Sequence, residues 1–258
     1  MGHTRSDSKV LSTVVTASHI IECISRHGEV TPNGVAKELN LSRSNAHRML
    51  ATLEELELVE HTSHGTYNLT FKLFELGNTV PHRKHLIDAA RPPMLRLSQA
   101  IGETVNNGVL YQDEVLYIDK VEPVNYLKLD TSIGSTDSLH NTSLGKVLAA
   151  FLETEQRERL ISRLVFTPTT PNTITNADDF RQELQRVRDA GFAMDRQELS
   201  LELNCVAAPV CDSRGQVCSA ISISGPAHRF NENRQHEVIP RLLQTVNEIS
   251  AQSFEAWC

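Results

Sequence analysis

Three helix-forming patterns lie close together between residues 14 and 53, and the signals between them tightly constrain the path of the chain. Residues 14–27 repeat apolar side chains three and four positions apart and end at Gly28, which is typical of a half-buried helix. Thr31 followed by Pro32 is an N-cap with proline at the first helical position, so a short second helix follows. Asn40 and Leu41 then form a tight turn, and Ser42 caps a third helix. We expect the inward-facing positions to be Ala17, Ile20, Ile21, Ile24, Val35, Ala36, Leu39, Ala46, Met49, Leu50 and Leu53.

A hairpin is expected after the third helix. The runs "LVEH" and "TYNL" are short β-like segments joined by residues 62–65. This order of elements is that of a winged helix-turn-helix, whose recognition helix enters the DNA major groove with its N-terminal residues at the base edges. The residues predicted to contact DNA are Thr31, Ser42, Arg43, Ser44, Asn45, His47, Arg48 and His64.

The distribution of charge supports DNA binding by this segment. The chain carries a formal charge of −7, and no part of it is a basic tail. Nevertheless, no Asp or Glu occurs between Glu38 and Glu54, the stretch that contains Arg43, His47 and Arg48. Acidic groups at this place would repel phosphates. The alternative is an ordinary three-helix core with a solvated outer face, which leaves both the hairpin and the acid-free stretch unexplained.

A domain boundary is expected near residue 81. Pro81 and residues 82–85 break the preceding pattern, and residues 87–101 then favour a helix whose early part Pro92 and Pro93 interrupt. The expected fold class is α+β, with a winged helix-turn-helix DNA-binding domain at 10–80, a linker helix region at 81–102 and a mixed α/β domain at 103–258.

The last of these domains is expected to contain an antiparallel sheet. "ETVNNGVLY" and "VLYIDKV" alternate around a short turn and favour a hairpin, and "NYLKLDTS" is a third strand-like run. "SLGKVLAAFL" and the segment after Asn176 favour helices. "NCVAAPV" and "QVCSAISISG" flank the turn "DSRG", and a long helix from Asn231 toward Trp257 follows, with Pro240 as a place for a bend.

Strand geometry predicts a small polar site in this last hairpin. If "DSRG" closes a two-residue turn, Asp212 faces Gly215, and counting back places Cys205 directly opposite Ser222. Alternation sends Ser224 to the same face. Hydroxyls, a thiol and nearby backbone N–H groups suit a small carboxylate-bearing molecule, although such residues also pack under helices without binding anything. The opposite, apolar face holds Val206, Val210, Ile221 and Ile223.

Other kinds of chemistry find less support. The five cysteines are odd in number and include no Cys-x-x-Cys pair, which argues against a disulfide framework and a zinc ribbon. Cys205 and Cys211 fall on one expected strand and Cys218 on the next, so with His140 they are mostly out of reach of a single tetrahedral metal centre. No Cys, His and Asp occur at a recognisable hydrolase spacing, and no Gly-rich phosphate loop is present. We therefore expect no metal, no cofactor and no enzyme activity.

The expected location is the cytoplasm. No segment approaches the roughly 20 apolar residues of a membrane span, and the start "MGHTRSDSKV" lacks the apolar stretch of a secretion signal. Contact with a membrane is therefore not expected.

Four segments together carry a family resemblance that covers most of the chain. "LSRSNAHRMLATLEELELVEH", "YNLTFKLFELG", "LHNTSLGKVLAAFL" and "MDRQELSLELNCVAAPVCDSRGQVCSAISISGP" resemble the IclR family of bacterial transcription regulators, with features similar to its sugar-acid regulators. The resemblance implies a winged helix, a linker helix and a GAF-like effector-binding domain, assembled as dimers or tetramers on operator DNA. The effector-lining positions that it implies are Ser143, Leu144, Gly145, Asp195, Cys205, Ser222 and Ser224.

Two positions depart from the family pattern. Glu57 stands where the family usually has glycine before the first wing strand, and Leu203 stands where it has glycine before the "CVAAPV" strand. We expect the wing and the rim of the pocket to differ in shape as a result.

The expected function is ligand-responsive regulation of transcription. The chain is predicted to be a sequence-specific DNA-binding repressor of a catabolic operon that responds to a small organic or sugar acid. A small-molecule hydrolase with a Cys/His site in the C-terminal domain and a DNA-independent sensor are the alternatives. Because one winged helix with so few positive charges makes few phosphate contacts, at least a dimer is expected. The N-terminal residues expected at its interface are Leu11, Val14, Val15, Phe74 and Leu76, which could equally be core.

Overall fold

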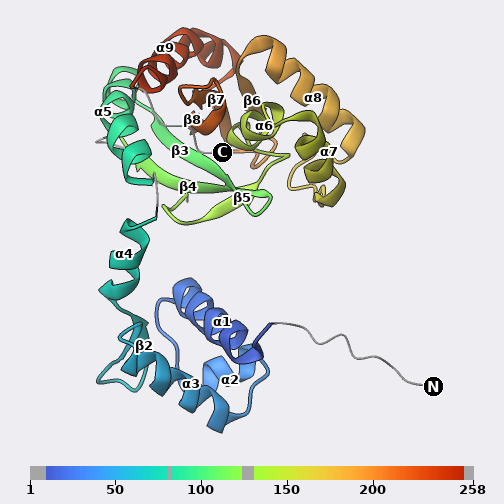
Figure 1. Ribbon diagram of the computed structural model, residues 1–258. Coiled ribbons are helices and arrows are strands. Elements are labelled where there is room, and N and C mark those ends of the chain that lie inside the picture. The colour runs from blue at the N-terminus through green and yellow to red at the C-terminus, as the bar shows by residue number, and fades with distance from the viewer. Residues whose placement is uncertain (1–9, 81–82, 124–130, 253–258) are drawn as a thin grey trace, which may run out of the picture. The chain divides into compact units, whose positions relative to one another are not determined.

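The computed structural model describes residues 10–80, 83–123 and 131–252, without the side chains of residues 83–85. The chain divides into two compact units, Met1–Pro81 and His82–Cys258 (Figure 1). Most of the strand-like run "NYLKLDTS" and the end of the long helix toward Trp257 lie outside the described residues. Among the described helices, none combines the length and the apolar character that a membrane-spanning segment requires.

The N-terminal unit contains the expected winged helix-turn-helix. Its strands pair antiparallel, with Val59 opposite Leu69 and His61 opposite Tyr67. Val30 forms an additional bridge to Tyr67, which ties the end of the first helix to the wing. Its elements are α1 (Ser12–His27), α2 (Pro32–Glu38), α3 (Arg43–Glu55), β1 (Val59–His61), β2 (Tyr67–Leu69) and α4 (Phe71–Asn78).

Side-chain caps begin α2 and α3 as the sequence predicts. The Thr31 hydroxyl accepts the N–H of Gly34 at 3.0 Å, and the Ser42 hydroxyl accepts the N–H of Asn45 at 3.2 Å. Each satisfies an N–H that would otherwise lack an intrahelical acceptor. The apolar positions between these helices form one buried cluster, which includes Ile20, Ile24, Val35, Ala46, Met49, Leu50, Leu53 and Val59.

Glu57 keeps the turn into the wing despite being a non-glycine residue. Its φ of 59° lies in the left-handed region, where an L side chain costs on the order of 1–2 kcal/mol. The turn is held by the N–H of Leu58, which donates to the carbonyl of Leu53 at 2.9 Å, and by the Thr70 hydroxyl, which donates to the carbonyl of Glu57. The backbone thus adopts the conformation that glycine favours, with a local cost in stability.

A further helix, α4, follows the wing within the segment that was predicted to belong to the DNA-binding domain. Thr70 caps it by accepting the N–H of Lys72 at 3.2 Å. None of its residues is buried, and the Phe71 side chain is 90% exposed. This helix therefore carries apolar side chains that nothing in its own unit covers.

The C-terminal unit is a six-stranded antiparallel sheet with helices on both faces, which confirms the expected fold class. The strand order is β5-β4-β3-β8-β7-β6. The first strand of the unit, β3, therefore pairs with the last, β8, at the centre of the sheet. The strands are β3 (Thr104–Tyr111), β4 (Glu114–Val121), β5 (Thr136–Ser138), β6 (Ala193–Arg196), β7 (Leu203–Cys211) and β8 (Val217–Pro226). The helices are α5 (Arg83–Ile101), α6 (Ser143–Ala150), α7 (Thr154–Arg163), α8 (Ala177–Ala190) and α9 (Glu232–Ser250).

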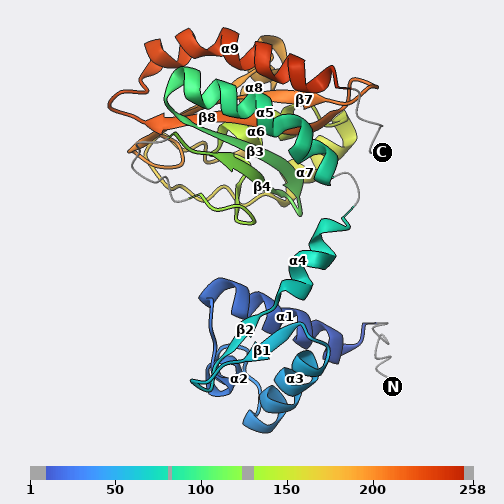
Figure 2. The ribbon, with the colours of Figure 1, turned by 90° about the vertical axis from the view of Figure 1, so that its left-hand side faces the viewer.

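Each face of this sheet has its own apolar core. Helices α5 and α9 lie side by side over one face, where they pack on Val105, Val206 and Ile223 (Figure 2). Helices α6, α7 and α8 lie on the other side, where Leu144, Leu160 and Phe180 form the second core (Figure 1). Adjacent residues of one strand therefore contact different helical layers.

The expectation that prolines interrupt the helix after residue 87 is wrong. Helix α5 runs without a break from Arg83 to Ile101 and contains both Pro92 and Pro93. Its buried side chains, which include Ala90 and Met94, pack into the core beneath it. This burial offsets the loss of backbone hydrogen bonds at the prolines.

The predicted pairing of β7 with β8 is wrong by two residues, yet the predicted faces are correct. Cys205 lies opposite Ser224 rather than Ser222, which lies opposite Ala207. The turn contains three residues rather than two, because Asp212 pairs with Gln216 through a 2.8 Å hydrogen bond. A register shift next to Cys211 adds the second residue. The longer turn and the register shift each move the pairing by one residue. Because a shift of two residues keeps every side chain on its face, the Cys205 thiol and both serines remain on one face.

Candidate functional site

A cavity of about 940 Å³ lies on the α6 side of the sheet. Six of the seven predicted effector positions line it: Ser143, Leu144, Asp195, Cys205, Ser222 and Ser224. The loop that precedes β7 and the start of that strand form another part of its wall, which includes Gln197, Leu199, Ser200, Leu201, Glu202 and Leu203. Leu203, which stands where the resemblance implies glycine, thus forms part of the cavity wall.

Gly145 does not line the cavity. Its N–H donates to the Thr142 hydroxyl at 3.1 Å, and its backbone presses against Leu139. A Cβ atom at this position would lie 2.4 Å from the Leu139 Cα atom, closer than real Cβ contacts occur. Gly145 therefore allows the start of α6 to approach the preceding loop rather than contacting a ligand itself.

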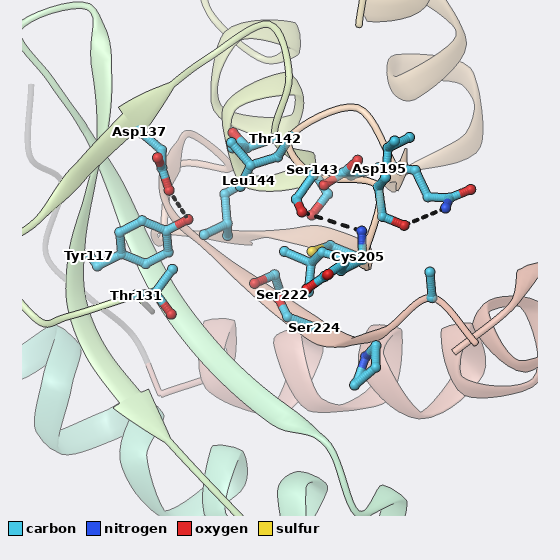
Figure 3. Close-up of a pocket in the computed structure, with 18 of the residues that line it drawn as sticks. Tyr117, Thr131, Asp137, Thr142, Ser143, Leu144, Asp195, Cys205, Ser222 and Ser224 are labelled. Carbon is cyan, nitrogen blue, oxygen red and sulfur yellow. Dashed lines mark hydrogen bonds between the residues drawn. The ribbon is translucent and has the colours of Figure 1, made fainter. Parts of the chain in front are cut away.

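The floor of the cavity is a polar triad on β7 and β8, formed by Cys205, Ser222 and Ser224 (Figure 3). The Asn106 side-chain amide on the neighbouring strand β3 donates to the hydroxyl of Ser222 at 3.3 Å and to that of Ser224 at 3.2 Å. Each serine hydroxyl that accepts from Asn106 can still donate its own proton, and the Cys205 sulfur beside Ser224 and a bound anion are the acceptors within the cavity. Asn106 was missed at the sequence level, where "TVNNGV" predicts only a strand.

The first turn of α6 offers backbone donors beside this floor. Thr142 caps the helix, and the N–H of Gly145 is already used by that cap. The amides of Ser143 and Leu144 are the remaining first-turn donors at the cavity wall. A helix N-terminus of this kind favours a negatively charged group.

Asp195 is a buried carboxyl at the edge of the cavity. One of its oxygens accepts the N–H of Glu198 at 2.7 Å, and the other has no hydrogen-bond partner in the structure. Burial, which removes the carboxyl from water, raises the pKa of Asp195 to about 7. Lys146, also buried, donates to the Met194 carbonyl and pairs with Glu198 at 2.5 Å. Asp195 can therefore change its charge near neutral pH.

Hydrogen-bond acceptors lie across the cavity from Asp195. The Tyr117 hydroxyl donates to Asp137 at 2.9 Å, and Figure 3 shows this pair on the opposite side of the triad. Burial raises the pKa of Asp137 above its ordinary value, with the Tyr117 hydrogen bond acting in the other direction. These residues were not predicted, since a single Tyr and a single Asp in separate runs carry no spacing signal.

The predicted DNA-contacting residues gather on the exposed surface of the N-terminal unit. Ala46, Met49 and Leu50 of α3 are buried, whereas the side chains between them point outward. Thr31 and Ser42 are exposed residues that also cap their helices. His64 is exposed in the turn between β1 and β2. The exposed residues of α3 are Arg43, Ser44, Asn45, His47 and Arg48.

Among the described residues, Cys205, Cys211, Cys218 and His140 do not gather into a metal or catalytic centre. Burial raises the pKa of the Cys205 thiol well above its usual range, which disfavours the thiolate that a nucleophile needs. The Cys218 thiol donates to the Val210 carbonyl at 3.4 Å, and the Nε2 atom of His140 lies 3.1 Å from the Thr167 carbonyl. Each group thus has a separate structural contact.

Comparison with known proteins covers both units. Residues 78–251 match the family described as "Bacterial transcriptional regulator IclR C-terminal", and residues 13–63 match the "IclR helix-turn-helix domain". The chain is 32% identical over 243 residues to the transcriptional regulator KdgR of Dickeya chrysanthemi, covering 94% of this chain and 80% of that protein. It is 29% identical over 208 residues to the transcriptional repressor AllR of Escherichia coli strain K12, covering 80% and 77%.

A solved structure shows the same fold. It is an IclR homologue from Microbacterium hydrocarbonoxydans complexed with 4-hydroxybenzoate, and its TM-score to this chain is 0.83. The two chains share 22% identity over 93% of this chain and 98% of the other.

Proposed function

We propose a specific role for this chain, which belongs to the IclR family of bacterial transcriptional regulators: it represses a catabolic operon in the cytoplasm and responds to a small hydroxylated carboxylic acid. Family membership establishes a DNA-binding transcription regulator with an effector-binding domain. It also excludes the small-molecule hydrolase that the sequence left open. Repression has support from AllR, a relative that is named as a repressor.

The chemistry of the cavity carries the proposal for the effector. One side offers hydrogen-bond donors, namely the hydroxyls of Ser222 and Ser224 and the first turn of α6. The other side offers the Tyr117 and Asp137 oxygens, which can accept from hydroxyl groups. A molecule with a carboxylate at one end and hydroxyls at the other satisfies both. The cavity volume of about 940 Å³ exceeds what a two- or three-carbon acid needs.

A thermal-shift screen with the full-length chain tests the effector class. Sugar acids, short 2-oxo acids and aromatic acids such as 4-hydroxybenzoate form the three arms, because a ligand that binds only the folded state raises its melting temperature. We expect the largest shift with a sugar acid. A shift confined to aromatic acids would contradict the hydroxylated class while leaving the carboxylate site in place.

The titration of Asp195 predicts that effector binding depends on pH. Above its pKa of about 7 the ionised carboxyl repels a carboxylate ligand, and below it the neutral form does not. An anionic ligand raises this pKa further, so binding takes up a proton and affinity increases as pH falls, by at most about tenfold per pH unit. Calorimetric titration between about pH 8 and about pH 6 measures this dependence. Asp195→Asn, which still accepts the Glu198 N–H, should flatten it; an equal slope in both proteins would contradict the assignment.

Arg43 and Arg48 should determine operator affinity. Both are exposed on α3, and an arginine that contacts a base edge typically contributes about 1–3 kcal/mol. Arg48→Ala should therefore weaken binding in a gel-shift titration with the chain's own upstream region, and it should reduce the preference over unrelated DNA. Arg159→Ala, which removes an exposed arginine of α7, is the matched control. Full operator affinity in both Arg43→Ala and Arg48→Ala would remove α3 as the recognition helix.

We further propose that the chain assembles as at least a dimer through α1 and α4. The predicted interface residues are all exposed rather than part of the N-terminal core. Such a set of uncovered apolar side chains in one unit is typical of an interaction surface. Its members, with two residues not predicted, are Val10, Leu11, Val14, Val15, Phe71, Phe74 and Leu76.

Phe74→Asp should shift the assembly toward the monomer, because it places a charge on that surface. Light scattering at micromolar concentration should give a smaller mass for this variant than for the parent chain. Operator affinity should fall as well, since a monomer contacts one half-site. Val165→Asp, an exposed apolar position in the C-terminal unit, is the control. A monomeric parent chain, with and without DNA, would contradict the proposal.

A further inference from the structure

A second cluster of ligand-type side chains lies in the N-terminal unit, away from the effector cavity. Cys23 and His27 stand four residues apart near the end of α1, and Glu38 is the last residue of α2. One potential ligand atom from each of these residues lies within 4.8 Å of the others. Among the residues that the structure describes, this is the one group of three or more His, Cys and acidic side chains gathered in this way.

The three side chains differ in their exposure to solvent. Cys23 is 1% exposed and belongs to the apolar core, whereas the side chains of His27 and Glu38 are 53% and 36% exposed. The Nε2 atom of His27 lies 2.9 Å from one Glu38 oxygen, and Arg26 donates to the other at 2.7 Å. The sulfur is therefore buried, whereas the imidazole and the carboxylate reach solvent.

We propose that Cys23, His27 and Glu38 bind a divalent cation of the zinc class. Sulfur, imidazole nitrogen and carboxylate oxygen are the three ligand types that Zn²⁺ takes, and residues four apart on a helix lie on one face. Three protein ligands leave a fourth tetrahedral position for water on the exposed side. Burial raises the pKa of the Cys23 thiol, so this thiol loses its proton only when its sulfur binds the cation; His27 and Glu38 bind through a ring nitrogen and a carboxylate oxygen.

The cation replaces the two contacts of the Glu38 carboxylate, those with Arg26 and with His27. Arg26 contacts the Glu38 carboxylate from solvent, and its side chain is 63% exposed, so it can move away when the cation takes that oxygen. The bound ion would join the end of α1 to the end of α2, two residues before Asn40 begins the turn into α3. This role goes beyond DNA and effector recognition, since it concerns the helix pair that supports α3.

Cobalt substitution tests the site in the full-length chain without DNA or effector. Co²⁺ bound to a thiolate gives a near-ultraviolet charge-transfer band, and four-coordinate Co²⁺ gives strong visible bands. We expect both bands to saturate at one Co²⁺ per chain and to disappear when Zn²⁺ displaces it. His27→Gln and Glu38→Gln change partly exposed residues and should weaken Co²⁺ binding by at least about tenfold. Loss of a residue that only supports a metal ligand already costs about that factor, and loss of a ligand should cost more.

His19 supplies a matched control. It also lies four residues from Cys23 on α1, but it is exposed and is not part of the cluster. His19→Gln should leave the cobalt spectrum unchanged, whereas Cys23→Ser should remove the charge-transfer band. Absence of the band in the parent chain, an unchanged Co²⁺ affinity in His27→Gln or Glu38→Gln, or loss of the band in Cys211→Ser would overturn the proposal.

Discussion

Replacing Gly145 by alanine should destabilise the C-terminal unit and weaken effector binding, even though Gly145 does not line the cavity. The new Cβ would lie 2.4 Å from the Leu139 Cα atom and 2.5 Å from its carbonyl oxygen. Both are backbone atoms, so α6 or the preceding loop must move. Such overpacking typically costs about 1–3 kcal/mol and sometimes more. Because Ser143 and Leu144 begin the same helix, their positions at the cavity wall should shift as well.

Thermal unfolding and effector titration measure the two effects of Gly145→Ala. A loss of about 3 kcal/mol should lower the melting temperature by roughly 6–12 °C in a chain of this size. Gly77→Ala provides the control, because Gly77 lies in α4 with no atom within 4 Å of the added Cβ. If Gly145→Ala melts and binds like the parent chain, the close approach of α6 to Leu139 is not required for the site.

Ser222→Leu and Ser224→Leu should each abolish the response to effector while leaving operator binding intact. Each change removes a hydroxyl that can donate to a carboxylate, a bond worth about 1.5–3 kcal/mol, and fills part of the cavity with an apolar side chain. Affinity for the effector should fall by at least about 100-fold, because the upper end of that energy range alone gives such a factor and the steric effect adds to it. The measurement is effector-dependent release or recruitment of the chain on operator DNA.

Two further variants distinguish loss of the hydroxyl groups from misfolding caused by the bulky leucine. Ser222→Ala and Ser224→Ala remove the hydroxyls without added bulk and should reduce affinity by smaller factors. Ser162→Leu, at an exposed position of α7, controls for the added leucine. A full effector response in both leucine variants would show that the effector binds elsewhere.

Local signals in the sequence predicted much of the DNA-binding unit and part of the effector cavity. Thr31 and Ser42 cap their helices as expected because capping depends on neighbouring residues. The faces of β7 and β8 were predicted correctly because side-chain alternation depends only on parity. The positions opposite one another were not, since the length of a turn and the presence of a bulge depend on tertiary contacts.

Residues that distant strands bring together were beyond reach from the sequence alone. Asn106 meets Ser222 and Ser224 only because β3 pairs with β8, more than 100 positions away in the chain. Tyr117 and Asp137 meet through the pairing of β4 with β5. The same tertiary packing carries α5 through two prolines that local rules place at a helix end.

Strand β3 has one further consequence for how the chain could transmit a signal. Asn106 holds the serines of the cavity floor, while its neighbour Val105 packs in the core beneath α5, the first helix of the C-terminal unit. A ligand that shifts the serines would therefore act on both sides of the sheet through a single strand. The allosteric coupling free energy can be no larger than the difference in the ligand's affinity for the two arrangements of that strand, and values of about 1–3 kcal/mol are usual. A regulator of this kind can change its affinity for an operator by about 5- to 150-fold without rebuilding its fold.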